Sequence, residues 1–169
     1  MLSYPPPTWD GRRITLYHGT LARFVPSILA GIDLSLAQDG RDFGRGFYTT
    51  TLLRQASFWA ENLANRTRAA HEPAVIAFDV DLHALSRLDS IAFARGAFDA
   101  DAFWSFVWHC RQRALDHGRD ANGGWYDLVV GPVAAAWRQR AQVGDYDQLS
   151  FHTDRAVSLL NGSRSRRVR

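Results

Sequence analysis

Residues 42 to 50 of the chain read Asp-Phe-Gly-Arg-Gly-Phe-Tyr-Thr-Thr, in which two glycines frame an arginine and lead into an aromatic and threonine-rich run. Gly44 and Gly46 indicate a turn, because glycine adopts backbone conformations closed to other residues and lets a ligand approach the main chain. The run after the turn predicts a short strand over residues 46–50. Tyr48 therefore stands on a strand entered through a glycine-rich loop, and the two readings of that loop are a plain turn and a ligand-approaching loop.

Upstream, residues 17–20 read Tyr-His-Gly-Thr and end an alternating stretch that predicts a strand over 13–18. Apolar residues at helical spacing predict a helix over 52–66, and a nearly all-apolar run predicts a central strand over 74–80. The remaining expected elements are helices over 24–32, 99–114 and 154–160, and strands over 126–130 and 148–152. Strands and helices mix without strict alternation, which predicts the α+β class.

The length of 169 residues fits one domain, which we place at 12–162 between an extended, proline-rich leader at 1–11 and a tail at 163–169. No apolar run is long enough to span a bilayer, and no secretory signal is encoded, so we expect no membrane association. The single cysteine, Cys110, fits a reducing compartment. We expect a cytoplasmic protein, in its own cell or in a target cell.

All 20 basic residues are arginine, and four of them lie in the tail, which has no acidic residue. The rest of the chain is therefore close to neutral, although the whole carries a formal charge of +3. Such a short arginine and serine tail is typical of a solvated end, and contact with nucleic acid is the alternative.

The segments around His18 and Tyr48 together resemble the nicotinamide pocket of the ADP-ribosyltransferase superfamily, of the diphtheria-toxin and poly(ADP-ribose)-polymerase type. The resemblance implies an ADP-ribosyltransferase-like fold, with two packed, mostly antiparallel sheets flanked by helices around an NAD cleft. It also implies that NAD is the co-substrate, cleaved at its nicotinamide–ribose bond. His18 would then bind the adenosine ribose, Gly19 the nicotinamide carboxamide through its backbone, and Tyr48 the nicotinamide ring.

The third catalytic position of that superfamily is often glutamate, but here the strand at 148–152 opens with Gln148. Glutamine can still bond the ribose 2′-hydroxyl, but it has no charge to favour the cationic transition state, and a plain strand opener is the competing reading. The pattern His18, Tyr48, Gln148, with residues 126–134 and 148–153, is similar to a bacterial family of ADP-ribosyltransferase-like proteins. Some of its members are encoded beside small antitoxin partners.

The resemblance implies further residues near NAD. Trp59 falls where the polymerase branch closes the second side of the nicotinamide ring, although its helical spacing fits a core residue equally well. The full expected NAD-binding set is Gly19, Thr20, Gly44, Arg45, Gly46, Ser57 and Trp59. His83, His109, His117 and His152 show no metal-ligand spacing, so we predict no metal.

The loop before the third catalytic strand presents the acceptor in this superfamily, and here it would span about 137–147, with Tyr146 and Asp147 as acceptor-loop residues. The expected function is mono-ADP-ribosyl transfer to a protein or nucleic-acid acceptor by a bacterial toxin or effector, with a small antitoxin or immunity protein as a partner. The alternatives are an NAD- or nucleotide-binding module without turnover, and an RNA-directed ADP-ribosyl or 2′-phosphate transferase.

Overall fold

Two β-sheets organise the computed structural model, which describes residues 11–66, 71–94, 96, 100–119 and 124–169. The first sheet has the order β1–β3–β7 and is antiparallel throughout, with β1 at Arg13–Leu21, β3 at Pro73–Asp81 and β7 at Arg164–Arg167. The second has the order β2–β6–β5–β4, with β2 at Phe47–Thr49, β4 at Ser90–Ala92, β5 at Leu128–Ala136 and β6 at Ala141–Phe151. Only β4 and β5 are parallel among these pairs, so the predicted α+β class is confirmed.

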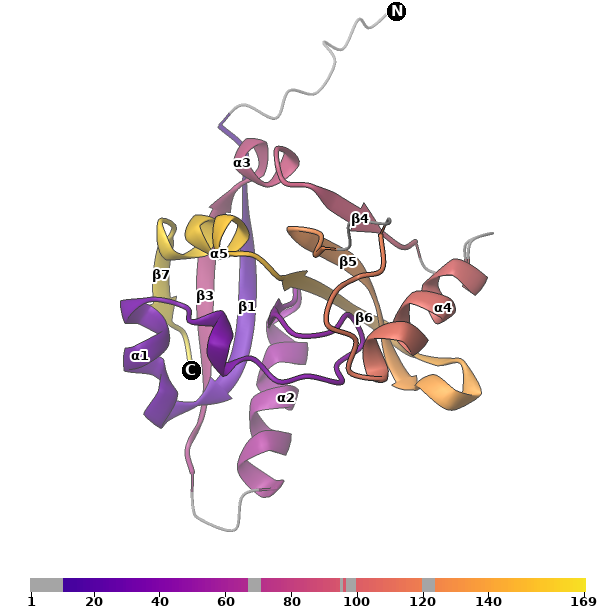
Figure 1. Ribbon diagram of the computed structural model, residues 1–169. Coiled ribbons are helices and arrows are strands. Elements are labelled where there is room, and N and C mark those ends of the chain that lie inside the picture. The colour runs from indigo at the N-terminus through magenta and orange to yellow at the C-terminus, as the bar shows by residue number, and fades with distance from the viewer. Residues whose placement is uncertain (1–10, 67–70, 95, 97–99, 120–123) are drawn as a thin grey trace, which may run out of the picture.

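Helices cover both sheets (Figure 1). They are α1 at Val25–Ala30, α2 at Leu53–Arg66, α3 at Leu82–Ser86, α4 at Ala100–Arg111 and α5 at Asp154–Asn161. Single 3-10 turns occur at Ala22–Phe24, Leu34–Leu36 and Trp137–Gln139. Figure 1 shows α4 beside β5 and β6, on the opposite side of the molecule from β7 and α1.

Strand β3 divides the apolar core because successive side chains of a strand point to opposite faces. Ile76 and Phe78 join the cluster that α1 and α5 cover, in which Val157 is buried. Val75 faces the other way and packs against Ala56 of α2. The nearly all-apolar composition that predicted a central strand therefore reflects burial on both faces.

A second apolar cluster lies between α4 and the four-stranded sheet. Phe103 and Val107 of α4 pack against Val129 of β5, and Phe43 from the glycine-rich loop completes the cluster. The loop that carries Phe43 is therefore anchored in the core rather than lying on the surface.

The two sheets meet where β1 approaches the end of β2. Tyr17 and Thr50 exchange both backbone hydrogen bonds, at 2.8 and 2.9 Å, in an isolated antiparallel bridge. This bridge brings the segment of His18 against the segment of Tyr48, although 30 residues separate them in the chain.

The structure differs from the expected tail at 163–169. Arg164–Arg167 form β7, paired with β3 from Asp79 to Ile76, rather than a separate solvated end. Arg167 and Arg169 form ion pairs with Glu72 and Glu61, so an acidic partner within the fold holds part of the basic end.

Several boundaries also differ. The predicted strands over 126–130 and 148–152 overlap a longer hairpin, because β5 begins only at Leu128, β6 ends at Phe151, and both strands extend to the 3-10 turn at Trp137–Gln139. The expected loop at 137–147 is therefore mostly strand. Helix α3 and strand β4 were not predicted, and both Asp99, the expected cap of α4, and the leader before Gly11 lie outside the described residues. In the described ranges, no helix is long and apolar enough to cross a membrane.

Candidate functional site

The glycine-rich loop is held from below by three ring side chains. Its three consecutive carbonyl oxygens accept hydrogen bonds as follows: Phe43 O from His117 Nε2 at 2.9 Å, Gly44 O from the Tyr48 hydroxyl at 2.7 Å, and Arg45 O from His152 Nδ1 at 2.8 Å. A carbonyl can only accept, so each of these ring nitrogens carries a proton. The ring side chains of His117, Tyr48 and His152 therefore fix the loop, and together they are called the floor of the site below.

Both glycines of the loop have a packing reason. Gly44 has a φ of +82°, and a Cβ there would lie 2.8 Å from the ring of Trp125. A Cβ on Gly46 would lie 2.6 Å from His152 Nδ1 and 2.7 Å from Ser150 Oγ. These contacts explain the two glycines without a ligand, so the sequence pattern by itself does not indicate a ligand-binding loop.

Two histidines of this floor are buried and neutral. Burial lowers the pKa of His152 to about 3 and that of His117 to about 4, and the two rings are 4.5 Å apart. His152 also stacks on Trp125, with ring centroids 5.5 Å apart. Ser150 Oγ and His152 Nε2 are buried without a hydrogen-bond partner, which marks this floor as the polar interior of the site.

His18 lies on β1 with a fixed ring. Its Nδ1 donates to the backbone oxygen of Tyr48 at 2.7 Å, and its ring stacks on Phe47 with centroids 4.2 Å apart. Burial lowers the pKa of His18, so the ring is neutral and Nε2 is left as an acceptor. The side chain is thus tied to β2, as a ligand-positioning residue would be.

Gly19, expected to hold the nicotinamide carboxamide through its backbone, packs on helix α2. A Cβ at this position would lie 2.1 Å from the carbonyl oxygen of Ala56 in α2. The absence of a side chain therefore lets β1 and α2 come into backbone contact. Thr20, the next residue of the expected NAD-binding set, is buried with 4% of its surface exposed.

Tyr48 directs its side chain into the protein. Its hydroxyl donates to Gly44 O and accepts from the Phe43 N–H at 3.0 Å, and its ring lies 6.5 Å from that of Phe43. Burial raises the pKa of the phenol well above its ordinary value. The hydroxyl therefore holds the loop, and only the partly buried ring is available to stack.

Gln148 is buried on β6 with 7% of its surface exposed. Its Nε2 donates to Asp42 Oδ2 and to the Pro132 carbonyl oxygen, each at 2.9 Å. Both amide hydrogens are used by these two bonds, so a ligand could bond this side chain only through Oε1.

Asp42 and Arg111 are site residues that the sequence interpretation missed. Asp42 is 5% exposed and pairs with Arg111 at the end of α4, whose Nε lies 2.9 Å from Oδ1. The one sequence signal for this pair was Asp42 itself, an acidic residue at the start of the glycine-rich stretch. Nothing in the local sequence connects it to Arg111, which is 69 residues away.

The other expected NAD-binding residues lie at the rim. Trp59 is 45% exposed and therefore not a core residue, and the guanidinium of Arg41 lies 5.7 Å from its ring centroid. Ser57 is partly buried on the same helix, and Arg45 is exposed. Arg41 and Trp59 bring the loop and α2 together at the surface.

The two acceptor-loop residues lie in β6 and face α2. The Asp147 carboxylate accepts from the Thr51 N–H at 3.0 Å and from the hydroxyls of Thr50 and Thr51, so it anchors the turn before α2. Tyr146 has its ring 6.5 Å from that of Phe58. Tyr146 and Asp147 thus join the hairpin to α2.

The strands bring the three predicted catalytic residues into one region without placing all three on one face. Tyr48 pairs with Ser150 across the β2–β6 ladder, and Gln148 is two residues from Ser150, so these side chains share a face. His18 stacks on Phe47, which points to the opposite face of β2. The site is therefore centred on the β2–β6 ladder, with His18 at its edge.

Two concavities among the described residues lie elsewhere. One, of about 330 Å³, borders α4 near Trp108, and the other, of about 500 Å³, lies between α3 and α5 near Arg155. Within the described ranges, no three His, Cys, Asp or Glu side chains gather as metal ligands, and the absence of a metal stays a prediction.

Comparison with known proteins gives a family without an assigned activity. None of the curated proteins matches the chain. A family model matches residues 14–162, a range that begins at the second residue of β1, extends past α5 and contains all of the site residues above. The chain therefore belongs to the family described as protein of unknown function DUF3990.

Proposed function

We propose that the protein is an NAD-dependent mono-ADP-ribosyltransferase with an ADP-ribosyltransferase-like fold. The observation that carries the proposal is Gln148, a buried side chain on the strand next to Tyr48, whose Nε2 hydrogens are both bonded within the protein so that a ligand could bond it only through Oε1. His18, neutral and bonded to the backbone of Tyr48, lies at the edge of the same region.

The proposed chemistry follows from the acceptor atoms and ring faces with which these side chains could contact a ligand. Cleavage of the nicotinamide–ribose bond develops positive charge on the ribose, as in glycoside hydrolysis. Gln148 Oε1 would accept from the ribose 2′-hydroxyl and place a partial negative charge near that centre. His18 Nε2 would accept from a hydroxyl of the second ribose. The Tyr48 ring would stack on nicotinamide, and the exposed Trp59 would close over it.

Binding of NAD requires a movement at the rim. The Tyr48 hydroxyl is bonded to the loop, and neither concavity described above includes His18, Tyr48 or Gln148. Arg41 and Trp59 form a cation–π contact at the surface, and we propose that separation of this pair opens the region without breaking the core.

A second candidate is an NAD-binding module without turnover. The uncharged Gln148 and the engaged Tyr48 hydroxyl favour it, because neither supplies charge to a developing cation. The basic end lends little support to the RNA-directed alternative, because Arg167 and Arg169 are paired with glutamates in the fold.

The biological setting remains part of the proposal. We propose a cytoplasmic toxin or effector that modifies a protein or nucleic acid, with a small antitoxin or immunity protein as a partner. The rings of partly buried Tyr146 on β6 and exposed Phe58 on α2 have centroids 6.5 Å apart, and Tyr146 is two residues from Gln148, so we propose that this aromatic pair receives the acceptor.

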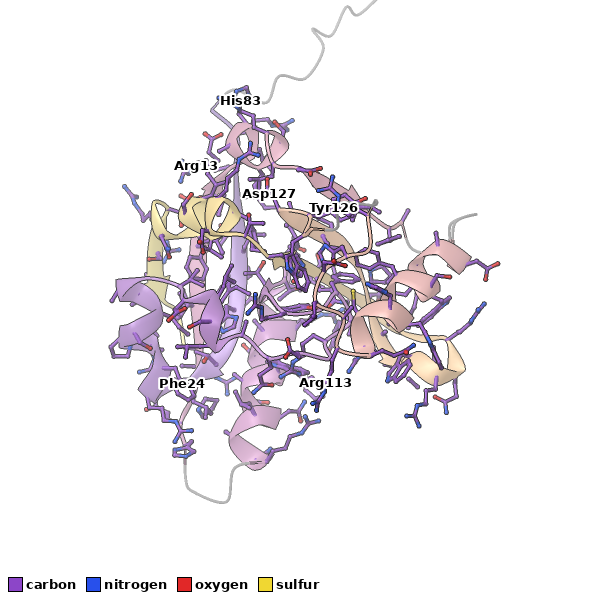
Figure 2. All side chains as sticks on the ribbon, in the orientation of Figure 1. Arg13, Phe24, His83, Arg113, Tyr126 and Asp127 are labelled. Carbon is purple, nitrogen blue, oxygen red and sulfur yellow. The ribbon has the colours of Figure 1, made fainter. Side chains whose placement is uncertain are left out.

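The test is nicotinamide release from NAD, followed by labelling of a cell lysate with radioactive NAD. We expect wild-type turnover and a loss of roughly 100-fold or more in His18→Ala, because a contact made in the transition state is removed. His83→Ala is the matched control, since His83 lies on α3 at the far end of the first sheet (Figure 2). NAD binding without nicotinamide release would select the second candidate, and no binding would reject both.

A further inference from the structure

Asp42 lies where the glycine-rich loop meets β5, β6 and α4. Its carboxylate accepts four hydrogen bonds: from Nε and Nη2 of Arg111, from the Ala134 N–H at 2.9 Å, and from Gln148 Nε2 at 2.9 Å. The guanidinium balances the buried charge, which would otherwise be costly. The two oxygens have separate tasks, because Oδ1 binds Arg111 and Oδ2 binds Ala134 and Gln148.

These contacts determine the orientation of the Gln148 amide. The two groups around Nε2 are a carboxylate oxygen and the Pro132 carbonyl, and both can only accept. An amide rotated by a half-turn would set Oε1 against two acceptors and lose both bonds. The side chain therefore has one orientation in which its polar atoms are satisfied.

We propose that Asp42 is a positioning residue that fixes Gln148 so that the substrate meets only Oε1, an acceptor. This inference rests on the proposed function and adds a cause for its specificity. Gln148 then selects a hydroxyl donor on the nicotinamide ribose and excludes an acceptor at the same place. Arg111 supports this role indirectly, by holding Asp42.

Asp42→Asn tests the inference. Asparagine keeps the size of the side chain, and we expect its oxygen to stay on the charged Arg111 guanidinium, because hydrogen bonds to an ionised donor are the stronger ones. Its NH2 group would then replace Oδ2 and face Ala134 N–H and Gln148 Nε2, which are both donors. Rotation of the Gln148 amide relieves its conflict with the new NH2 group, although it loses the bond to the Pro132 carbonyl oxygen, and it turns the Gln148 NH2 toward the substrate. We expect kcat for nicotinamide release to fall about 10- to 100-fold with little change in KM, because the lost contact belongs to the transition state.

Substrate preference separates positioning from simple damage. The probes are NAD and an NAD analogue that lacks the 2′-hydroxyl on the nicotinamide ribose. The wild type should prefer NAD by kcat/KM, and Asp42→Asn should lose most of that preference, because its Gln148 no longer offers an acceptor.

Asp127→Asn is the matched control. Asp127 is 6% exposed and accepts from Thr153 Oγ1, from Asp89 N–H at 3.0 Å and from Arg155 at 3.0 Å. It lies near the opposite end of the second sheet, close to Tyr126 in Figure 2, and makes no contact with Gln148 in these bonds. The same substitution there should cost similar stability and leave the preference for NAD unchanged.

A second pair of variants, Gln148→Glu alone and Gln148→Glu with Asp42→Asn, exchanges the hydrogen-bond donor and acceptor between positions 42 and 148. Gln148→Glu alone should lose activity, because its carboxylate would face Asp42 and the Pro132 oxygen. Addition of Asp42→Asn supplies a donor to that carboxylate and should restore part of the loss, giving a favourable coupling between the two positions. Additive losses would overturn the inference.

A measurement on the unaltered chain covers the case in which Asp42→Asn does not fold. Both side-chain amide protons of Gln148 should exchange slowly with solvent in nuclear magnetic resonance spectra. Rapid exchange would overturn the inference, as would a wild-type preference retained in Asp42→Asn. If the wild type releases no nicotinamide, the proposed function fails and the inference fails with it. If the wild type releases nicotinamide but Asp42→Asn keeps the preference for NAD, only the inference fails.

Discussion

Gly19→Ala tests whether the glycine after His18 serves packing or the approach of a ligand. A Cβ at Gly19 would lie 2.1 Å from Ala56 O, 3.0 Å from Ala56 C and 3.1 Å from Ala60 N. Ordinary contact begins at 3.4 Å, so β1 and α2 would have to separate by about 1.3 Å at this point. The obstacle is main chain, which cannot rotate away as a flexible side chain would.

The expected cost is that of an overpacked core. Such insertions typically cost 1–3 kcal/mol and occasionally more, and we expect about 3 kcal/mol here because helix backbone must move. For a chain of this size, that loss lowers Tm by roughly 6–12 °C. The free energy of unfolding, measured by urea denaturation with circular dichroism, checks the prediction.

Gly144→Ala is the matched control on β6. A Cβ there meets no atom within 4 Å, so its unfolding free energy should change by less than about 0.5 kcal/mol. Equal stability of the two variants would refute the packing argument. A fully stable Gly19→Ala that no longer binds NAD would show that the glycine is present for the ligand.

Three further predictions concern the floor and the rim of the site. Tyr48→Phe should lower the free energy of unfolding by about 1–3 kcal/mol, because two buried loop groups lose their partner; an unchanged urea midpoint would contradict this. Below pH 6.5 the unfolded chain protonates its histidines while the folded pKa values of His117 and His152 stay at about 4 and about 3. Stability should therefore fall as pH drops from 6.5 toward 4, by about 1.4 kcal/mol per pH unit for each histidine, in urea titrations of wild type and of a His83→Ala control. A flat profile between pH 7 and 5 would exclude neutral burial. Trp59→Ala should leave stability within about 0.5 kcal/mol but weaken NAD binding several-fold in a fluorescence-detected titration, because an exposed ring contributes through stacking alone; unaltered binding would remove Trp59 from the site.

The predicted elements that were confirmed have periodic apolar patterns of their own. Helix α2, predicted over 52–66, is found at Leu53–Arg66, and the strand predicted over 74–80 is found at Pro73–Asp81. Such patterns record how a segment buries its own side chains. Strand β7 has no apolar pattern, since Arg-Ser-Arg-Arg is a strand only through its ladder with β3.

The candidate site divides in the same way. The sequence by itself indicated that His18, Tyr48 and Gln148 stand on strands, because alternation and glycine punctuation are local properties. The roles of the residues beside them, such as Gly19, Gly44 and Asp42, depend on distant segments and could not be predicted from local sequence.

Only the tertiary structure decided what those neighbours do. Gly19 is a glycine because α2 crosses β1 at backbone distance, and the loop glycines leave room for Trp125, Ser150 and His152. Gln148 donates hydrogen bonds of 2.9 Å to Asp42, which is 106 residues away in the sequence, and to the Pro132 carbonyl oxygen. A residue pattern specifies which conformations a segment can adopt, but hydrogen bonds and close contacts depend on which distant segment packs against it, and packing fixes that partner only in the folded chain.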